Sequence, residues 1–313
     1  MKDFNRLTTR LHQFGGWRLL WQYARMGVLW TGIKEFFKCL YNSRSVKSIY
    51  PIITQKIDRK LLATIKTPET YAITPQLEPT SSKLKIWFCW LQGVDHAPEL
   101  VKMCCMSLRR NLPDADVVII DNNNYKQYVT LPEYILQKYD MGIIPHPMFS
   151  DLLRLELLLK HGGTWIDASV LCTSNLHWQA IQASELFVFR YFRNGKVVGM
   201  ANWFIHAKAG NPLLHMVRDM LHAYWHEYNC VVEYYIFHLF FSEAAKRYPE
   251  FMHSMPRGNA FANIQLGNRL AMDYDDAWWK QHTSQVSFHK LNYRKADEAS
   301  LNPHSFYNHI INT

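Results

Sequence analysis

The stretch SDLLRLELLLKHGGTWIDAS, residues 150–169, contains the elements that decide the fold. Its first half is rich in leucine and predicts a buried helix that begins at Ser150, a residue suited to the N-cap position. Gly162 and Gly163 then allow a tight turn into a short apolar strand that leads to Asp167. A buried helix that turns directly into a buried strand is typical of α/β proteins.

The segments before this stretch continue the alternation of strands and helices. The runs KLKIWFCW and DVVIID predict two buried strands, which a helix joins in a βαβ unit whose strands run parallel. The predicted elements outside the leucine-rich helix are Leu84–Trp90, Pro98–Arg110, Asp116–Asp121, Pro132–Tyr139 and Thr164–Val170. The sequence therefore predicts an α/β fold with a mainly parallel, Rossmann-like sheet flanked by helices.

Composition restricts the class of protein. The chain has 313 residues, of which 48% are hydrophobic, so it can bury a sizeable core and is not disordered throughout. Its six cysteines form no CxxC pair, which favours a reducing, cytoplasmic compartment and no structural zinc. The first residues lack the apolar region of a signal peptide, and no long uncharged apolar run occurs. We therefore expect neither secretion nor a membrane span.

The basic charge of the chain lies at its N-terminal end. Residues 1–66 contain 13 Lys and Arg against 3 Asp and Glu, a net charge of +10, whereas the other residues carry 22 against 23, or −1. Three prolines mark residues 67–82 as a linker. We predict a basic, aromatic, helical N-terminal segment at 1–66, a linker at 67–82 and a main domain at 83–313.

Three interpretations fit the N-terminal segment, in which Trp17, Trp21 and Trp30 stand among lysines and arginines. Its helices can lie on an anionic membrane surface, with aromatic rings inserted among the headgroups. They can instead pack on the main domain and turn a basic side to water. Aromatic rings interleaved with cations can also stack nucleic-acid bases. Gly27 and Gly32 weaken the helix and permit a break in it.

Polar residues stand where the predicted strands end, which is where parallel α/β sheets bind ligands. These positions are Trp90–Gly93, Asp121–Asn124 and Asp167–Ser169. The asparagines of the second group are also ordinary turn caps. Trp90, which Gln92 follows closely, can be a core residue or can offer a flat surface to a nucleotide base. Such stacking contributes about 1–3 kcal/mol per base.

Common catalytic motifs are absent. Neither GxGxxG nor GxxxxGK[ST] occurs, so the usual dinucleotide fingerprint and phosphate-binding loop are excluded. The sequence also lacks HExxH and GxSxG, which argues against a zinc protease and a serine hydrolase. His222 and His226 stand four residues apart without an evident third ligand, so we expect no metal site there.

Four segments resemble one protein family: IWFCWLQG, SLRRNLPDADVVIID, FSDLLRLELLLKHGGTWIDASV and FHKLNY. Together they are similar to the capsular polysaccharide synthesis glycosyltransferases, relatives of the sugar transferases that carry a DXD motif on a GT-A fold. The resemblance implies that a nucleobase stacks on Trp90 and that Asp151 and Arg154 bind a nucleotide sugar. The DXD motif falls on Asp167–Ser169, with Asp167 as its catalytic carboxylate, and Trp165 precedes it by two residues.

The resemblance also implies a divalent cation, Mn²⁺ or Mg²⁺, at this motif. Ser169 stands where related proteins often have a second carboxylate, and a hydroxyl binds a hard cation more weakly. The predicted metal ligands are Asp167, Ser169 and His289, the last from FHKLNY. Alternatively, Lys290 and Arg154 neutralise the donor diphosphate without a metal ion.

The predicted substrate-binding residues form a larger set around the motif. They are Trp90, Gln92, Asp151, Arg154, Gly163, Trp165, Asn202 and Lys290. Asn202 follows the third predicted strand and can either line a sugar pocket or serve as a strand-edge amide.

The resemblance implies a glycosyltransferase whose catalytic domain, 83–313, is GT-A-like. Its expected donor is a nucleotide sugar, a UDP-sugar in the first instance, and its acceptor a capsular or cell-surface polysaccharide or a lipid-linked glycan. We expect a cytoplasmic enzyme, peripheral on the inner face of the plasma membrane. A non-catalytic nucleotide-sugar-binding protein is the first alternative. A nucleic-acid-binding protein would explain the basic N-terminus but not the sugar-site residues, so we expect no nucleic-acid partner.

Overall fold

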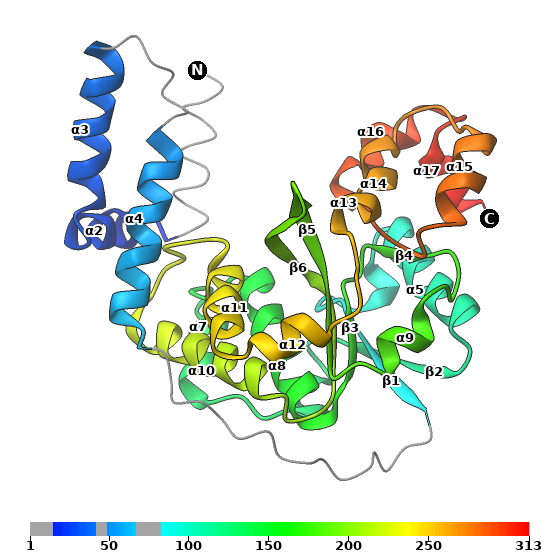
Figure 1. Ribbon diagram of the computed structural model, residues 1–313, viewed down its shortest axis with the longest axis horizontal. Helices are drawn as coiled ribbons and strands as arrows, with labels where there is room; N and C mark the ends of the chain where they lie inside the picture. Colours follow the sequence, from blue (N-terminus) through cyan, green and yellow to red (C-terminus); the bar gives the residue numbers. More distant parts are fainter. Residues whose placement is uncertain (1–14, 42–48, 67–82, 313) are drawn as a thin grey trace. The chain divides into compact units, whose positions relative to one another are not determined.

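The computed structural model describes residues 15–41, 49–66 and 83–312 (Figure 1). The described residues form two compact units. One combines residues up to 66 with 131–152 and 216–244, and the other contains 83–130, 153–215 and 245–312. The predicted linker, 67–82, lies outside the described residues, and the predicted domain boundary there stays a prediction.

The second unit contains all the strands that the structure describes. They are β1 (Leu84–Cys89), β2 (Ala115–Ile120), β3 (Gly163–Ile166), β4 (Val170–Cys172), β5 (Leu186–Arg193), β6 (Lys196–Ala207) and β7 (Phe288–Lys290). Five of them form a sheet in the order β2-β1-β3-β6-β5, in which β1 is parallel to β2 and β3. β6 is antiparallel to both of its neighbours, so the other four strands point the same way. The prediction of an α/β fold with a mainly parallel sheet is confirmed.

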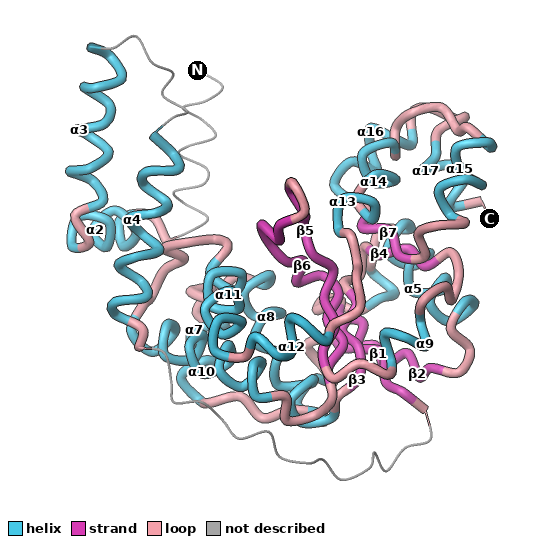
Figure 2. The backbone as a smooth tube through the Cα atoms, viewed as in Figure 1, coloured by secondary structure: helices cyan, strands magenta, loops and turns pink. Residues whose placement is uncertain are grey.

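The third predicted strand, Thr164–Val170, is not continuous. β3 ends at Ile166, and the chain turns at Asp167–Ser169 before β4 begins at Val170. β4 leaves the main sheet and pairs with β7, antiparallel, in a separate two-stranded ribbon (Figure 2). The Val170 amide donates to the Asp167 carbonyl over 3.0 Å, which closes the turn. Asp167 therefore stands at a corner between two sheets.

Helices occur in both units of the described structure. They are α2 (Trp17–Arg25), α3 (Val28–Tyr41), α4 (Ile49–Thr64), α5 (Glu99–Asn111), α6 (Tyr125–Tyr128), α7 (Glu133–Asp140), α8 (His146–His161), α9 (Trp178–Gln182), α10 (Pro212–Glu227), α11 (Ile236–Arg247), α12 (Pro249–Ser254), α13 (Ala260–Asn263), α14 (Gln265–Arg269), α15 (Asp276–Thr283), α16 (Ala296–Ser300) and α17 (Phe306–Ile311), with 3₁₀ turns at Val94–His96 and Tyr293–Lys295. α5 connects β1 to β2 and packs against β2 and β4.

The leucine-rich helix, α8, begins at His146 and not at Ser150 as predicted. The Ser150 hydroxyl donates to the Pro147 carbonyl over 2.9 Å, so Ser150 lies inside the helix and is not its N-cap. Pro147 stands in the first turn, where a missing N–H has no consequence for the helix. Pro147 was therefore the sequence signal that the helix begins before Ser150.

The glycine pair after α8 makes the predicted tight turn, because both residues have a positive φ. The carbonyl of Gly162 accepts a hydrogen bond from the indole of Trp87 on β1, over 2.8 Å. A Cβ on Gly163, whose φ is 99°, would stand 2.4 Å from the carbonyl oxygen of Lys85. Gly163 therefore lets β3 approach β1, at the opposite end of β3 from Asp167.

The first unit confirms the helical N-terminal segment within the described residues. α2 packs on α3, and α3 packs on α4. The break between α2 and α3 occurs at Gly27, which has a positive φ. The Lys56 ammonium of α4 donates to the Gly27 carbonyl over 2.7 Å. The Tyr23 hydroxyl donates to the Val232 carbonyl over 2.9 Å, which fixes α2 to a later part of the same unit. In the described parts of the chain, no helix is both long and apolar enough to cross a membrane.

We expect Gly163→Ala to lower the free energy of unfolding by more than Gly195→Ala does. Both residues have a positive φ, which costs a residue with a Cβ about 1–3 kcal/mol. Only Gly163 adds a clash with a neighbouring strand, because a Cβ on Gly195 meets nothing within 4 Å. Urea unfolding of the two variants measures the difference. Equal losses would show that β3 and β1 do not approach as closely as described.

Candidate active site

Asp167 is held by its backbone at the corner between β3 and β4. Its amide donates to the carbonyl of Trp203 on β6 over 2.9 Å, and its carbonyl accepts from Val170. The side chain is about a quarter exposed, at 25%. The sequence prediction that a carboxylate stands at the end of β3 is therefore met, and the corner gives that carboxylate access to solvent.

Three side chains contact the Asp167 carboxylate. The Lys290 ammonium donates to Oδ2 over 2.6 Å, and the Trp165 indole donates to Oδ1 over 2.8 Å. The Arg154 guanidinium lies 3.5 Å from Oδ1. These four residues are called the Asp167 cluster below. They come from the turn after β3, the strands β7 and β3, and the helix α8.

Electrostatics keep Asp167 ionised. Burial acts to raise the pKa of its carboxyl, but the charges of Lys290 and Arg154 and the hydrogen bonds from Lys290 and Trp165 outweigh that effect, so its pKa lies below the usual value. At neutral pH the cluster thus contains one carboxylate between two cations.

Arg154 is fixed in place more firmly than Lys290. Its side chain is only 4% exposed, and it donates to the backbone carbonyl of Asn202 over 2.6 Å. The guanidinium also lies over the ring of Trp165, 4.8 Å from the centroid, in a cation–π contact. Lys290 is 25% exposed, so its ammonium is the more accessible of the two cations.

Trp165 and Asn202 position other groups. Trp165 donates a hydrogen bond to Asp167, and its ring contacts the Arg154 guanidinium. Because Trp165 is only 1% exposed, its ring is not open to a substrate in this structure. Asn202 reaches the cluster through its backbone carbonyl, and its half-buried side chain stands on β6 beside the corner. Both were predicted to bind substrate, and that role stays a prediction; the structure shows that the Asn202 carbonyl contacts Arg154 and that the Trp165 indole contacts Asp167.

Trp90 lies at the same edge of the sheet as Asp167. β1 and β3 are parallel neighbours with Trp87 opposite Trp165, so the residues just beyond the two strands share that edge. The Trp90 ring is half-buried and packs edge-on against Tyr293, with 5.4 Å between centroids. Among the described residues, its indole N–H has no hydrogen-bond partner although the atom is buried.

The other strand-end residues differ in their roles. Gln92 is exposed in the loop after β1. The asparagines after β2 close a turn: Asp121 accepts from the amides of Asn123 and Asn124, and the Asn124 side chain bonds back to Asp121 and Ile119. Of the three asparagines, Asn124 is therefore shown to cap the turn with its side chain.

The remaining predicted substrate-binding residues are Asp151 and Gly163. Asp151 is buried on α8, one turn before Arg154, with 6% of its surface exposed. Gly163 stands at the far end of β3, where the close approach of two strands explains it, so the structure does not bring it to the Asp167 cluster.

The predicted metal ligands do not come together. His289 adjoins Lys290 on β7, and neighbouring residues of a strand face opposite sides, so His289 points away from Asp167. Its Nε2 lies 3.0 Å from the Thr173 hydroxyl, and burial, followed by the charge of His282, lowers its pKa to about 3. Ser169 is buried, and its carbonyl accepts from the Leu291 amide.

The donor set also differs from that of a metal site. Both oxygens of Asp167 already accept hydrogen bonds from Lys290 and Trp165. In the part of the chain that the structure describes, no three His, Cys, Asp or Glu side chains are grouped so that they could hold a metal ion. These residues do not fit a metal ion held by protein side chains, and the Mn²⁺ or Mg²⁺ requirement stays a prediction.

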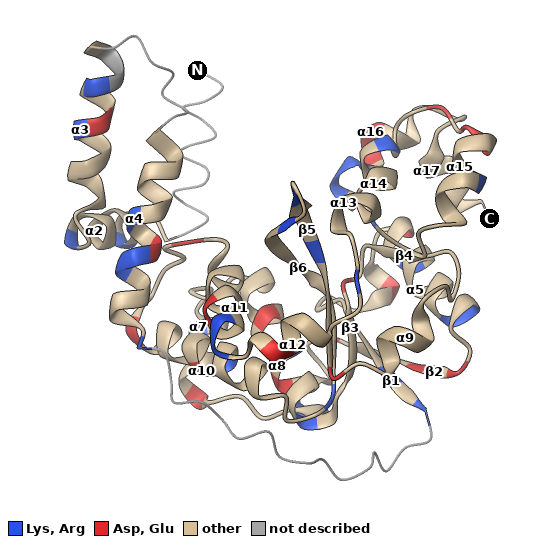
Figure 3. Cartoon of the chain, in the orientation of Figure 1, with Lys and Arg blue, Asp and Glu red and all other residues tan. Residues whose placement is uncertain are grey.

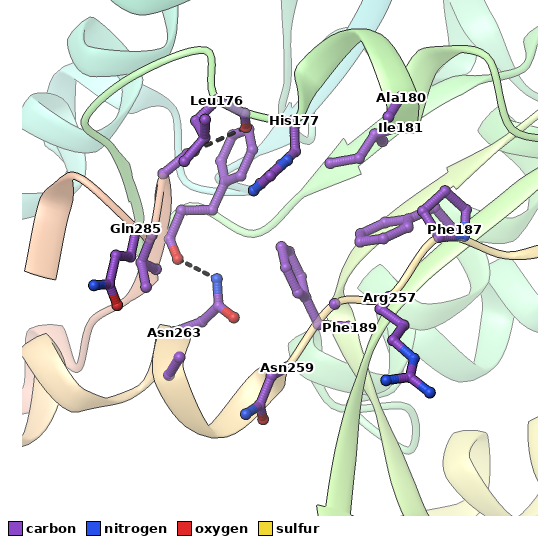
Figure 4. A pocket seen from close by; sticks show the side chains of 16 residues that line it. Leu176, His177, Ala180, Ile181, Phe187, Phe189, Arg257, Asn259, Asn263 and Gln285 are labelled. Atoms are coloured by element: carbon purple, nitrogen blue, oxygen red, sulfur yellow. Dashed lines mark hydrogen bonds between the residues drawn. The ribbon is translucent and has the colours of Figure 1, made fainter.

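A pocket of about 200 Å³ lies elsewhere in the second unit, between β5, α9, α13 and β7 (Figure 4). Phe187, Phe189 and Phe288 supply aromatic surface, and Arg257 and Asn259 supply polar groups. Sequence analysis did not predict this pocket, because its lining comes from segments up to about 110 residues apart with no shared motif.

The sheet separates this pocket from the buried part of the Asp167 cluster. The rings of Phe187 and Phe189 both contact that of Phe204, so these three side chains share one face. Trp165 pairs with Ile205, the residue after Phe204, and therefore faces the other side. The pocket and the Arg154–Trp165 contact thus lie on opposite faces of the sheet.

Tyr293 is the site residue that sequence reasoning missed. It belongs to the segment FHKLNY, three residues after Lys290, and covers one edge of Trp90. The signal in the sequence was the short spacing between Tyr293 and Lys290, a residue already predicted to bind substrate.

The chain is similar to several known proteins. The model of the family described as "Capsular polysaccharide synthesis protein" matches residues 34–310. The chain is 30% identical over 193 residues to the O-glycosyltransferase braB of Annulohypoxylon truncatum, covering 56% of this chain and 44% of that protein. It is 23% identical over 175 residues to the O-glycosyltransferase PaGT of Phomopsis amygdali, covering 51% and 43%. The chain thus spans less than half the length of these two relatives.

A solved structure, titled "PaToxG Glycosyltransferase", is also similar, with 16% sequence identity and a TM-score of 0.37. The match covers 66% of this chain and 82% of that one.

We expect Asp167→Asn to lower the free energy of unfolding at pH 7 by about 1–3 kcal/mol, because it removes the charge that pairs two cations. Since folding lowers the pKa of Asp167, its stabilising effect is complete above about pH 4, the ordinary carboxyl value, and is lost as pH falls through the folded pKa. The difference from the parent protein should therefore shrink in acid. Urea unfolding at several pH values measures it.

Asp116→Asn serves as the control for this experiment. Asp116 is 52% exposed, its ion pair with Lys85 spans 3.7 Å, and exposed pairs contribute little. If Asp167→Asn destabilised no more than Asp116→Asn at pH 7, the Asp167 cluster would not be the stabilising centre described.

Proposed function

The chain belongs to the capsular polysaccharide synthesis protein family, and we propose that it is a glycosyltransferase that uses a nucleoside-diphosphate sugar. The acceptor would be a polysaccharide or a lipid-linked glycan, and the enzyme would work in the cytoplasm at the membrane surface. Two relatives whose names describe them as O-glycosyltransferases support the class of reaction.

One observation carries the proposal: two cations converge on a partly exposed carboxylate at the ligand-binding edge of an α/β sheet. A diphosphate needs positive charge at a place that its oxygens can reach. Lys290 meets that need, because its ammonium is accessible and three donor hydrogens let it keep Asp167 while it binds a phosphate oxygen. Arg154 adds a fixed positive charge behind it.

Trp90 and Tyr293 would hold the nucleobase. Trp90 is half-buried at the same edge of the sheet as the cluster, and an edge-on contact with Tyr293 fixes the orientation of its ring. Its indole N–H, which is buried and has no partner among the described residues, could donate to a ligand oxygen. Base and diphosphate would then be recognised by two neighbouring groups of side chains, the aromatic pair and the Asp167 cluster.

The reaction would be a displacement at the anomeric carbon of the donor sugar. The bond from that carbon to the diphosphate oxygen breaks, an acceptor hydroxyl forms the new bond, and negative charge develops on the departing nucleoside diphosphate. A cation already oriented toward that position stabilises the charge without reorganisation, which is commonly the largest single contribution to catalysis. Asp167 would act by holding Lys290 and Arg154 in that orientation.

The Asp167 cluster itself offers a divalent ion few ligands, because both oxygens of the Asp167 carboxylate already accept hydrogen bonds. If a divalent ion accompanies the donor, phosphate oxygens and water would supply most of its ligands, as they commonly do for Mg²⁺. The chemistry proposed for Lys290 does not depend on that ion.

Binding measurements test the division between base and diphosphate sites. We expect Trp90→Ala to weaken UDP and uridine by similar factors, on the order of 10 to 100, because stacking acts on the base. Lys290→Gln should weaken UDP about 10- to 100-fold and leave uridine unchanged, because a charged hydrogen bond to phosphate contributes about 1.5–3 kcal/mol. Lys280→Gln, which removes a lysine that is 74% exposed on α15, is the matched control. Equal effects of Lys290→Gln on UDP and uridine would contradict the assignment.

Turnover separates an enzyme from a non-catalytic binding protein. UDP release from a panel of UDP-sugars, with and without Mn²⁺, should be measurable for the parent protein. We expect Lys290→Gln to lower it by on the order of 100 to 1,000 fold, the loss typical when one preorganised electrostatic contact is deleted. Tight binding of a UDP-sugar without UDP release in the presence of glycan acceptors would instead favour the binding protein.

A further inference from the structure

α3 presents an apolar stripe to solvent. Trp30, Ile33, Phe37 and Tyr41 are 73%, 48%, 64% and 91% exposed, respectively. Their spacing of three, four and four residues places them on one face of the helix. Large apolar side chains that are exposed singly need no explanation, whereas four in a row on one helix face indicate a contact surface.

This stripe is not the face by which α3 packs in its own unit. Val28 is 2% exposed and belongs to the opposite face. On that same face, a Cβ on Gly32 would lie 3.5 Å from the Ile53 side chain of α4. α3 therefore already buries one face against α4, and the stripe is a second apolar face.

α2 adds two exposed tryptophans to the same unit. Trp17 and Trp21 stand one turn apart and are 85% and 62% exposed. The Arg25 guanidinium lies 5.6 Å from the centroid of the Trp21 ring. The buried side of α2 is formed by other residues, Leu19 and Gln22. Like α3, α2 thus keeps aromatic rings outside its packed face.

Most of the charges around these rings are positive, although Glu227 of α10 lies 3.9 Å from Arg25. α2 and α3 carry Arg18, Arg25, Lys34 and Lys38 against a single acid, Glu35, which pairs with Lys38 over 2.7 Å (Figure 3). Lys34 follows Trp30 by one turn and therefore flanks the stripe. The sequence up to residue 66 carries a net charge of +10.

We infer that the exposed faces of α2 and α3 bind the surface of an anionic lipid bilayer. Tryptophan and tyrosine rings suit the boundary between headgroups and acyl chains, and nearby cations suit anionic headgroups. A protein partner would not require this excess of cations. Because α3 has only 14 residues and carries two lysines, Lys34 and Lys38, it would lie on the bilayer and not cross it.

This inference deepens the membrane-surface location in the proposed function, since it names the residues that make the contact. A catalytic unit held at the bilayer would meet a lipid-linked acceptor by diffusion in two dimensions. Lipid binding itself needs neither donor nor acceptor, so the two proposals can fail separately.

Sedimentation of the full chain with vesicles tests the inference. Vesicles of phosphatidylcholine with 30% phosphatidylglycerol should carry the protein down at low salt, and vesicles of phosphatidylcholine alone should not. The double change Trp30→Gln with Phe37→Gln should reduce the partition coefficient at least about tenfold, because it removes inserted rings. Arg18→Gln with Lys34→Gln should reduce it about 30-fold at low salt, since each cation near the surface contributes about a factor of five.

Leu301→Gln is the control for lost apolar surface, because Leu301 is 83% exposed and belongs to the other unit. It should bind vesicles like the parent protein, and Trp30→Gln with Phe37→Gln should release UDP from the donor at the parental rate without vesicles. Indifference to phosphatidylglycerol or equal binding by all variants would overturn the inference. Failure to bind vesicles together with Trp30- and Phe37-dependent binding of single-stranded DNA would overturn it in favour of nucleic acid. Vesicle binding without UDP release would contradict only the proposed enzyme.

Discussion

The pairing of Asp167 with Lys290 and Arg154 is the interaction on which the second unit depends. Without its partners, a carboxylate at the end of a buried strand would be costly, and a guanidinium that is 4% exposed would be costlier still. Together they satisfy one another, and the ring of Trp165 supports both. The contact joins α8, β3 and β7, so these three charges also fix how the ribbon of β4 and β7 meets the main sheet.

Much of the fold could be predicted because its elements have local causes. β-forming apolar runs gave β1 and β2 to within about a residue, the glycine pair gave the turn after α8, and Gly27 gave a break in the N-terminal helices. The position of Asp167 beside Arg154 could also be predicted, because a short turn returns the chain along the helix. These inferences needed only neighbours in the sequence.

The remaining features depend on contacts between distant segments. The strand predicted at Thr164–Val170 divides because β4 finds β7, more than a hundred residues later, and not another strand of the main sheet. The direction of the His289 side chain follows from that pairing. The residues next to His289 in the sequence therefore could not reveal that it points away from Asp167 and is not a metal ligand there. Tyr293 reaches Trp90 for the same reason, and the pocket of Phe187 and Phe288 likewise has no signature in any one segment.

The sequence separation between Asp167 and Lys290, 123 residues, has a consequence for the order of events during synthesis. β1, β2 and β3 can pair while the later part of the chain is still being made, because everything they need precedes residue 167. The ammonium that completes the charge cluster, that of Lys290, is made only 123 residues after Asp167. A nascent chain that ends between these two residues could therefore pair β1, β2 and β3, but its Asp167 carboxylate would lack the Lys290 ammonium.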